Sequence, residues 1–249
     1  MNKRLFGLLL VLILFSGVFQ TVHAETEAKP VAPTDIMILM TELGLASQSE
    51  MRDARQPVGD VYLDMLEHCF FYRPAINTDK LTIDGGAAVI MILLGYEQPL
   101  SVYGSYLVGG SVMGRQLGLF KGITAKGSSL LTNADAARML YNAFEIPFFS
   151  SNIISDSLRL TKTDVCILDN LGLKKIDGVI CETHYTKINS NIKAGHALIE
   201  YTTKNLLPNG RRETLSGADT FSIGIKNPEE LIGRNMEAYV RDFADGKEI

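Results

Sequence analysis

Two short stretches of the sequence place a threonine and an acidic residue at the start of an alanine-rich apolar run. Thr82 and Asp84 form the first pair, and Thr132 and Asp135 form the second about fifty residues later. A threonine at this point can accept a hydrogen bond from a free backbone N–H of the first helical turn, and a carboxylate suits its positive end. The two stretches therefore predict two capped helices.

Positively charged side chains are few near these stretches. Ile83 and Asn133 follow the two threonines, and neither carries a charge. Lys121 falls on the loop before the second helix, and Arg138 falls one turn into it. From these residues alone, we expect the threonine and the carboxylate to cap each helix.

Catalytic constellations are not evident in the sequence. His184 and His196 fall in expected strands near Glu182 and Glu200, where a metal site or an acid–base pair can be imagined. The simpler interpretation is exposed strand histidines beside ordinary charges. There is no Gly-x-Ser-x-Gly, no His-Glu-x-x-His and no phosphate-binding loop. We therefore expect a protein that is not an enzyme and that needs no metal and no cofactor.

Helical patterns surround both threonine stretches. Pro147 closes the second helix, and Gly95 can end the first in the left-handed conformation. A shorter helical stretch and a loop precede each of them, which makes residues 34–149 a region of helix–loop–helix repeats. The expected elements are helices over 82–94 and 131–145, the preceding helices over 62–70 and 111–119, and a third, incomplete copy over 36–45.

Residues 132–135 read threonine, asparagine, alanine and aspartate, and an alanine-rich apolar helix follows. This pattern resembles the second helix of an S-layer homology repeat, whose signature is a threonine, a basic residue, a small residue and an acid. In that family the repeats pack as a helical prism with a pseudo-threefold arrangement and bind the pyruvylated secondary polysaccharide of the cell wall. The resemblance implies a glycan-binding motif on Thr82, Asp84, Thr132, Asn133 and Asp135, with Lys121 and Arg138 as compensating cations.

After Pro147 the alanine-rich helices give way to short β-branched and aromatic stretches. Residues 149–152 are polar, and we expect an exposed linker there. The sequence thus predicts an α+β chain whose helical repeats precede a small β-rich module over 155–249, similar to the module that often follows such repeats in exported proteins of Gram-positive bacteria. A hairpin-type turn at Asp245–Gly246 indicates a further strand or more protein beyond it. The expected elements are a helix over 162–171, a helical turn over 228–233 and strands over 175–185, 196–201, 220–225 and 235–242.

Residues 1–24 have the pattern of a cleaved secretory signal peptide, with Lys3 and Arg4 before an apolar run. An uncleaved anchor is the alternative, although the run is short for the ~20 residues of a spanning helix. Cleavage removes two of the 24 basic residues and none of the 28 acidic ones, so the net charge of −4 becomes −6. An acidic chain has little attraction for nucleic acid. We expect a secreted protein of the cell wall or cell surface, without nucleic acid and without stable membrane insertion.

Cys69, Cys166 and Cys181 are the only cysteines of the chain. An odd and sparse set does not predict a disulfide scaffold, and the close ligand pairs of a zinc site are absent from the sequence. Cys69 and Cys166 lie in apolar stretches, so we expect small buried residues at both positions. A Cys166–Cys181 disulfide stays open, because both residues fall in the second module.

The hypothesis that follows is an exported cell-surface protein with degenerate S-layer homology-like repeats. These repeats would associate non-covalently with secondary cell-wall polysaccharide or another peptidoglycan-associated glycan. Two alternatives stay open. The repeats can serve as a non-binding scaffold or protein-interaction region of a larger exported protein, or a hydrolase domain can lie beyond Ile249.

Overall fold

The computed structural model describes residues 36, 40, 55–154, 157–186, 192–207, 209, 211–222 and 228–241. Three expectations from the sequence fall outside these residues. They are the signal peptide over 1–24, most of the third repeat copy over 36–45, and the hairpin turn at Asp245–Gly246.

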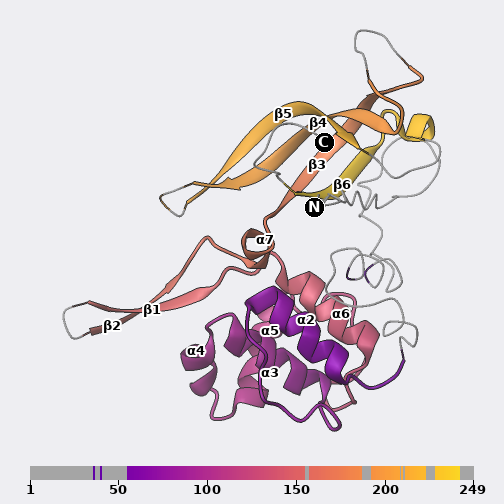
Figure 1. The fold of residues 1–249 in the computed structure, drawn as a ribbon. Coiled ribbons are helices and arrows are strands. Elements are labelled where there is room, and N and C mark those ends of the chain that lie inside the picture. The colour runs from indigo at the N-terminus through magenta and orange to yellow at the C-terminus, as the bar shows by residue number, and fades with distance from the viewer. Residues whose placement is uncertain are drawn as a thin grey trace, which may run out of the picture. The chain divides into compact units, whose positions relative to one another are not determined.

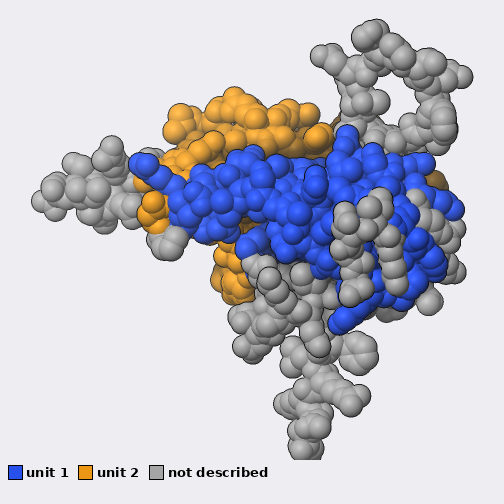
Figure 2. All heavy atoms as spheres, turned by 90° about the horizontal axis from the view of Figure 1, so that it is seen from above, with its two compact units in different colours: residues 1–31, 172–207, 211–249 blue, residues 32–171, 208–210 orange. Residues whose placement is uncertain are grey.

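The chain contains both helices and antiparallel sheets, so the α+β expectation is confirmed. It divides into two compact units, which Figure 2 shows in different colours. The helical unit comprises residues 32–171 and 208–210, and the sheet unit comprises residues 1–31, 172–207 and 211–249. The units therefore divide at Leu171 and Gly172, later than the change of composition near Pro147.

Five helices make up most of the described helical unit (Figure 1). Four of them, α2, α3, α5 and α6, have eleven residues each. The expectation of helices over 62–70, 82–94, 111–119 and 131–145 is confirmed with shifted ends, whereas α4 was not expected. The bounds are α2 Asp60–Phe70, α3 Ile83–Leu93, α4 Glu97–Ser101, α5 Tyr106–Gln116 and α6 Asn133–Ala143.

The core of the helical unit is formed by the apolar faces of these helices. Tyr62 on α2 is fully buried, and its hydroxyl donates a hydrogen bond to Gly86 O on α3 at 3.2 Å. Each large side chain removed from water contributes about 1.5–3 kcal/mol, before the cost of ordering it. The fully buried residues include Met65, Leu66, Ile83, Ile90, Met91, Met139, Leu140 and Phe144.

Helices α3 and α5 cross at a point where only small residues fit. A Cβ added at Gly110 of α5 would come within 2.6 Å of Ala88 Cα on α3. At Gly109, an added Cβ would come within 2.6 Å of Leu100 O. The two glycines therefore permit the close approach of α5 to its neighbours, which larger residues would prevent.

The stretch over 149–152 is not a linker, and this expectation from the sequence is wrong. It belongs to β1 (Phe149–Ile154), which pairs with β2 (Ser157–Lys162) in an antiparallel two-stranded ribbon. The base of the ribbon is attached to the end of α3, because Phe149 N donates to Leu94 O at 2.7 Å. The Tyr96 ring packs on the Phe149 ring with centroids 4.9 Å apart. This attachment explains why the ribbon belongs to the helical unit.

The expected helix over 162–171 is also shorter than predicted. It is reduced to α7 (Ile167–Asn170), because Lys162 still belongs to β2. The carboxylate of Asp169 accepts a hydrogen bond from Cys166 N at 2.7 Å and so caps this single turn.

The sheet unit contains a four-stranded antiparallel sheet with the order β5-β4-β3-β6. A register shift lies between Ile180 and Glu182 of β3. Gly233, which follows the 3₁₀ turn η2, has a φ of 76° and reverses the chain before β6, as its expected role as a stop requires. The bounds are β3 Leu173–Thr183, β4 His196–Leu206, β5 Arg212–Ser222, η2 Pro228–Leu231 and β6 Asn235–Arg241.

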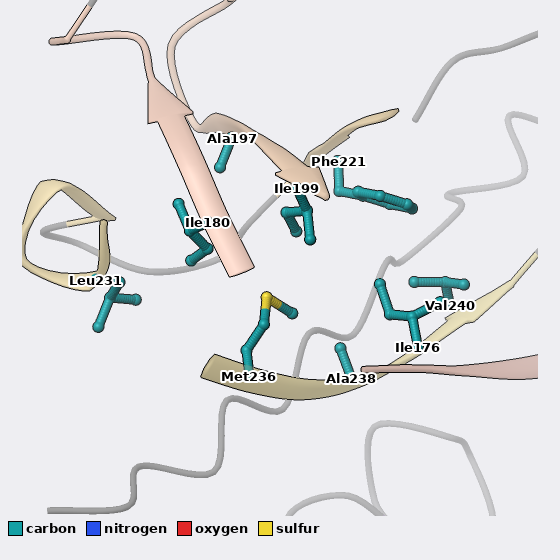
Figure 3. Packing of buried hydrophobic residues seen from close by; sticks show 9 residues of the cluster. All are labelled: Ile176, Ile180, Ala197, Ile199, Phe221, Leu231, Met236, Ala238 and Val240. Atoms are coloured by element: carbon teal, nitrogen blue, oxygen red, sulfur yellow. The ribbon is translucent and has the colours of Figure 1, made fainter. Parts of the chain in front are cut away.

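One face of this sheet carries its apolar core (Figure 3). Tyr201 lies at the edge of the core, where its ring packs edge-on against Phe221 with centroids 5.5 Å apart. Gly178 makes room for this tyrosine, since an added Cβ would come within 2.9 Å of Tyr201 Cβ. The core residues are Ile176, Ile180, Ala197, Ile199, Phe221, Leu231, Met236, Ala238 and Val240.

Strands β4 and β5 are longer than the sequence predicts. They pair over eleven residues, from His196 opposite Ser222 to Leu206 opposite Arg212. The expected strand over 220–225 therefore covers only the end of β5. The missed part is rich in threonine, serine and charged residues, whose weak strand signal is outweighed by backbone pairing with β4.

Candidate functional site at the helix starts

Both threonines cap their helices, as the sequence predicts. Thr82 Oγ1 accepts a hydrogen bond from Gly85 N at 3.1 Å, and Thr132 Oγ1 accepts one from Asp135 N at 3.2 Å. Each threonine has extended backbone angles, which is the geometry of a residue that precedes the first helical turn. Capping uses the hydroxyl oxygens, and both side chains are half-buried.

The two acidic residues have different surroundings. Thr132 donates its hydroxyl proton to Asp135 Oδ2 at 2.7 Å, so this carboxylate is bonded to the cap itself. The carboxylate of Asp84 lies against Gly127, where an added Cβ would come within 2.1 Å of Oδ2. Asp84 Oδ1 is buried and has no hydrogen-bond partner among the described residues. Each carboxylate places negative charge at the positive end of its own helix, where an external anion would otherwise lie.

Backbone pairing joins the start of α3 to the segment before α6. Ile83, the first residue of α3, donates its N–H to Ser129 O at 3.0 Å. In return, Leu131 N donates to Leu81 O at 2.8 Å. These bonds use backbone groups that the first turn of α3 cannot satisfy internally.

The same pairing joins the start of α6 to the segment before α2. Asn133, the first residue of α6, donates its N–H to Gln56 O at 3.0 Å, and Val58 N donates to Leu131 O at 3.0 Å. Gly59 then precedes α2 as Thr82 precedes α3, but no side-chain hydrogen bond caps α2. By position, α2 therefore corresponds to α3 and α6, and not to the shorter helix that we expected before α3.

The loop between α5 and α6 is held by two side chains of α6. Asn142 Nδ2 donates to Leu119 O at 2.9 Å and to Lys121 O at 2.8 Å. The Arg138 guanidinium lies beside Gly122, since an added Cβ there would be 3.4 Å from Arg138 Cζ. Both contacts fix the backbone of the loop, while the Lys121 side chain is exposed to solvent.

Three of the positions considered for a cation are buried. Ile83 is fully buried, Asn133 is 6 % exposed and Arg138 is 7 % exposed. Arg138 therefore supports the loop and does not face solvent, so the structure does not favour its role as a compensating cation. A charged side chain at position 83 or 133 would have to displace packed neighbours or be buried at high cost.

Exposed positive charge is found on the loop itself. Residues 121–129, which we call the lysine loop, contain Lys121 and Lys126 and no acidic residue. Both lysines are exposed, and neither makes an ion pair with any described residue. The loop adjoins the start of α3, because Asp84 N donates to Gly127 O at 2.9 Å. Lys126 was missed from the sequence because its proximity to Asp84 depends on pairing between distant segments.

A second charged group joins Arg73, which follows α2, to three acidic residues of that helix. Arg73 forms ion pairs with Asp60 at 3.3 Å, with Glu67 at 3.5 Å and, most closely, with Asp64. The hydrogen bond to Asp64 is the largest cause that raises the pKa of Arg73. The three acids recur along one helix face, a spacing that the sequence does show. Exposed ion pairs of this kind stabilise a fold only slightly.

The histidines are not part of a metal-binding group among the described residues. His184 lies in the turn after β3 and packs against the Tyr185 ring, with centroids 4.8 Å apart. His196 begins β4, and its Nδ1 lies 3.1 Å from Ala194 O. Across the described ranges, no group of three or more histidine, cysteine, aspartate and glutamate side chains is placed to hold a metal ion.

All three cysteines are free, so the Cys166–Cys181 disulfide is not formed. Cys69 and Cys166 are buried, as the sequence predicts. Burial raises the pKa of the Cys69 thiol to about 12, which makes it an unreactive apolar side chain at neutral pH.

In the part of the chain that the structure describes, every helix is too short or too polar to cross a membrane. No family model, no curated protein and no solved structure matches the chain. The helix starts and the lysine loop are therefore the features of the chain that bear on its function.

Proposed function

We propose that the helical unit is a degenerate S-layer homology-like module of an exported protein, and that it associates non-covalently with cell-wall polysaccharide. The single observation that carries the proposal is the repeated geometry of the helix starts. The first residues of α3 and α6 make the same backbone pairing with the segment before another helix. A repeated helix start joined in this way is what a repeat family with pseudo-threefold packing requires.

The polysaccharide would be held chiefly by the lysine loop. An anionic sugar chain needs exposed cations and free donors, and Lys121 and Lys126 supply ammonium groups on a loop without acids. The hydroxyls of Ser128 and Ser129 are donors on the same exposed loop. Because Asp84 and Asp135 already offset the positive helix ends, we expect weaker binding than an arginine-bearing motif would give.

Sedimentation with cell-wall sacculi tests this proposal. The secreted chain is mixed with sacculi that retain the secondary polysaccharide and with sacculi from which acid has stripped it. We expect the chain to sediment with the first and to stay in solution with the second. Equal recovery with both preparations would show that the polysaccharide is not the ligand.

A non-binding scaffold is the second candidate, and the burial of Asn133 and Arg138 favours it. In that case the threonines and carboxylates only stabilise helix starts, and the helical unit supports the rest of an exported protein. The sedimentation experiment separates the two candidates, because a scaffold would leave the chain in solution with both preparations.

A further inference from the structure

Strand β5 forms one edge of the sheet, and no described strand pairs with its other side (Figure 1). One hydrogen bond shows which backbone groups of β5 point away from β4. Leu207 N donates to Arg211 O at 2.7 Å, so the backbone groups of Arg211 point toward β4. In an antiparallel pair, hydrogen-bonded residues alternate with residues whose N–H and C=O groups point away from the partner. Continuing the register with β4, the outward-pointing residues of β5 are Arg212, Thr214, Ser216, Ala218 and Thr220.

Strand β5 carries charges near its ends (Arg212, Glu213 and Asp219), but several usual protections of an edge strand are missing from it. Natural edges are kept from pairing by lysines, prolines, bulges or short length. β5 has eleven residues, contains neither lysine nor proline, and keeps an unbroken register with β4. Its middle, from Thr214 to Ala218, is uncharged and largely exposed. This edge therefore presents a regular set of backbone donors and acceptors to another strand.

The order of residues in β5 suits pairing with itself. In an antiparallel pair centred on Leu215, the outward-pointing Thr214 lies opposite Ser216 of the second copy, so each edge satisfies the other. Leu215, which is 42 % exposed, meets its own counterpart. Arg211 then lies opposite Asp219 of the second copy, and this pair of opposite charges occurs twice.

The neighbouring register is disfavoured by charge. A pair centred on Ser216 would place Glu213 opposite Asp219 of the second copy, and like charges directly opposite each other destabilise a sheet. A pair centred on Gly217 would cover the whole of β5 but would bring no opposite charges together. Charge pairing at this edge therefore favours the register centred on Leu215, and a twofold contact closes after two copies.

We propose that β5 pairs with β5 of a second copy of this chain, so that two sheets join into one continuous sheet across a twofold axis at Leu215. The inference is independent of the proposed wall association, because it concerns only the sheet unit.

A cysteine placed on the axis tests the register. Directly opposite residues in a non-hydrogen-bonded pair have Cα atoms about 4.5 Å apart, within the range that a disulfide spans. In a Cys181→Ser background, Leu215→Cys is expected to form a disulfide-linked dimer on mild oxidation. Thr202→Cys, exposed on the neighbouring strand β4, is the matched control and is expected to stay monomeric. Failure of Leu215→Cys to cross-link, or equal cross-linking by the control, would overturn the proposal.

A proline tests the edge without breaking the sheet. The N–H of Ser216 points away from β4, so Ser216→Pro removes one outward donor and spares the β4 pairing. Sedimentation velocity at protein concentrations up to about 100 µM detects complexes with micromolar Kd values. We expect dimers for the wild type and for the control Ser216→Thr, and monomers for Ser216→Pro. Wild-type monomers at every concentration, or dimers of a folded proline variant, would overturn it. If the proline variant does not fold, the cysteine experiment decides.

Discussion

Thr82 and Thr132 each hold one backbone N–H of a first helical turn, but the carboxylates beside them differ. Asp135 is bonded to the threonine hydroxyl, whereas Asp84 packs against Gly127 and leaves one oxygen buried without a described partner. In both places the chain's own negative charge lies at the positive helix end. An external anion therefore gains little from the helix ends and depends on the exposed lysines nearby.

The cap of α6 gives the first prediction. Thr132→Ala removes the acceptor for Asp135 N and the donor to the Asp135 carboxylate, so we expect the free energy of unfolding to fall by roughly 0.5–2 kcal/mol. Urea denaturation measures this change. Thr132→Ser keeps both bonds and is the control. A wild-type stability in Thr132→Ala would show that the capping bonds contribute nothing.

Two buried acids on α2 give a prediction about alkaline pH. Burial raises the pKa of Cys69 to about 12 and raises that of Tyr62 further above its ordinary value, with a smaller contribution to Tyr62 from Cys69. The unfolded chain therefore loses these protons first. The stability they contribute is fully present below about pH 9 and is lost as pH rises toward 12, at up to about 1.4 kcal/mol per pH unit for each group.

Urea denaturation across this pH range measures the loss. Cys69→Ala should reduce the alkaline slope, because one of the two titrating groups is gone. Tyr62→Phe removes the other titrating group and should reduce the slope as well. A slope that Cys69→Ala does not alter would contradict the assignment.

Single residues show which features of the site the sequence could predict. The caps were predictable, because a threonine before a helix and an acid two or three residues later act within one turn. The burial of Ile83 and Asn133 was not, because it depends on segments before α6 and α2 that are far away in the sequence. For the same reason Arg138 could not be recognised as a support for the loop at Gly122.

At the scale of elements, the crossing of α3 and α5 gives a further prediction. Gly110→Ala adds a Cβ within 2.6 Å of Ala88 Cα, so the helices must move apart. We expect a loss of roughly 1–3 kcal/mol in the free energy of unfolding, measured by urea denaturation. Val108→Ala on the same helix is the control, because Val108 is 51 % exposed and its loss should cost less than about 0.5 kcal/mol. An equal effect of both substitutions would mean that the crossing is not tightly packed.

Helices with a periodic apolar pattern were predicted well. Strands that depend on backbone pairing with a neighbouring strand were not. The apolar repeats of α3 and α6 indicated helices with almost correct ends. Residues 149–152 of β1 were predicted to be an exposed linker because three of the four are polar, whereas their strand geometry comes from pairing with β2. Most of β5 was missed for the same reason, since β4 supplies its hydrogen bonds.

For the whole molecule, the proposed wall association and the proposed self-association concern different units. The lysine loop belongs to the helical unit, and the β5 edge belongs to the sheet unit. The chain is acidic overall, with a net charge of −4, so non-specific attraction to an anionic glycan is weak and binding must come from a local cluster of cations. Because both loop lysines are exposed, salt screens their attraction to an anionic glycan, and we expect added salt to weaken binding.

The central claim is that the lysine loop holds wall polysaccharide, and the affinity of lysine variants for the purified polysaccharide tests it most directly. Lys121→Gln with Lys126→Gln removes both exposed cations of the loop. The control, Lys193→Gln with Lys204→Gln, removes two exposed lysines of the sheet unit and causes the same change in net charge. By titration calorimetry we predict that the loop variant weakens binding about tenfold and that the control binds as the wild type does. Equal affinities of the loop variant and the wild type would contradict the account.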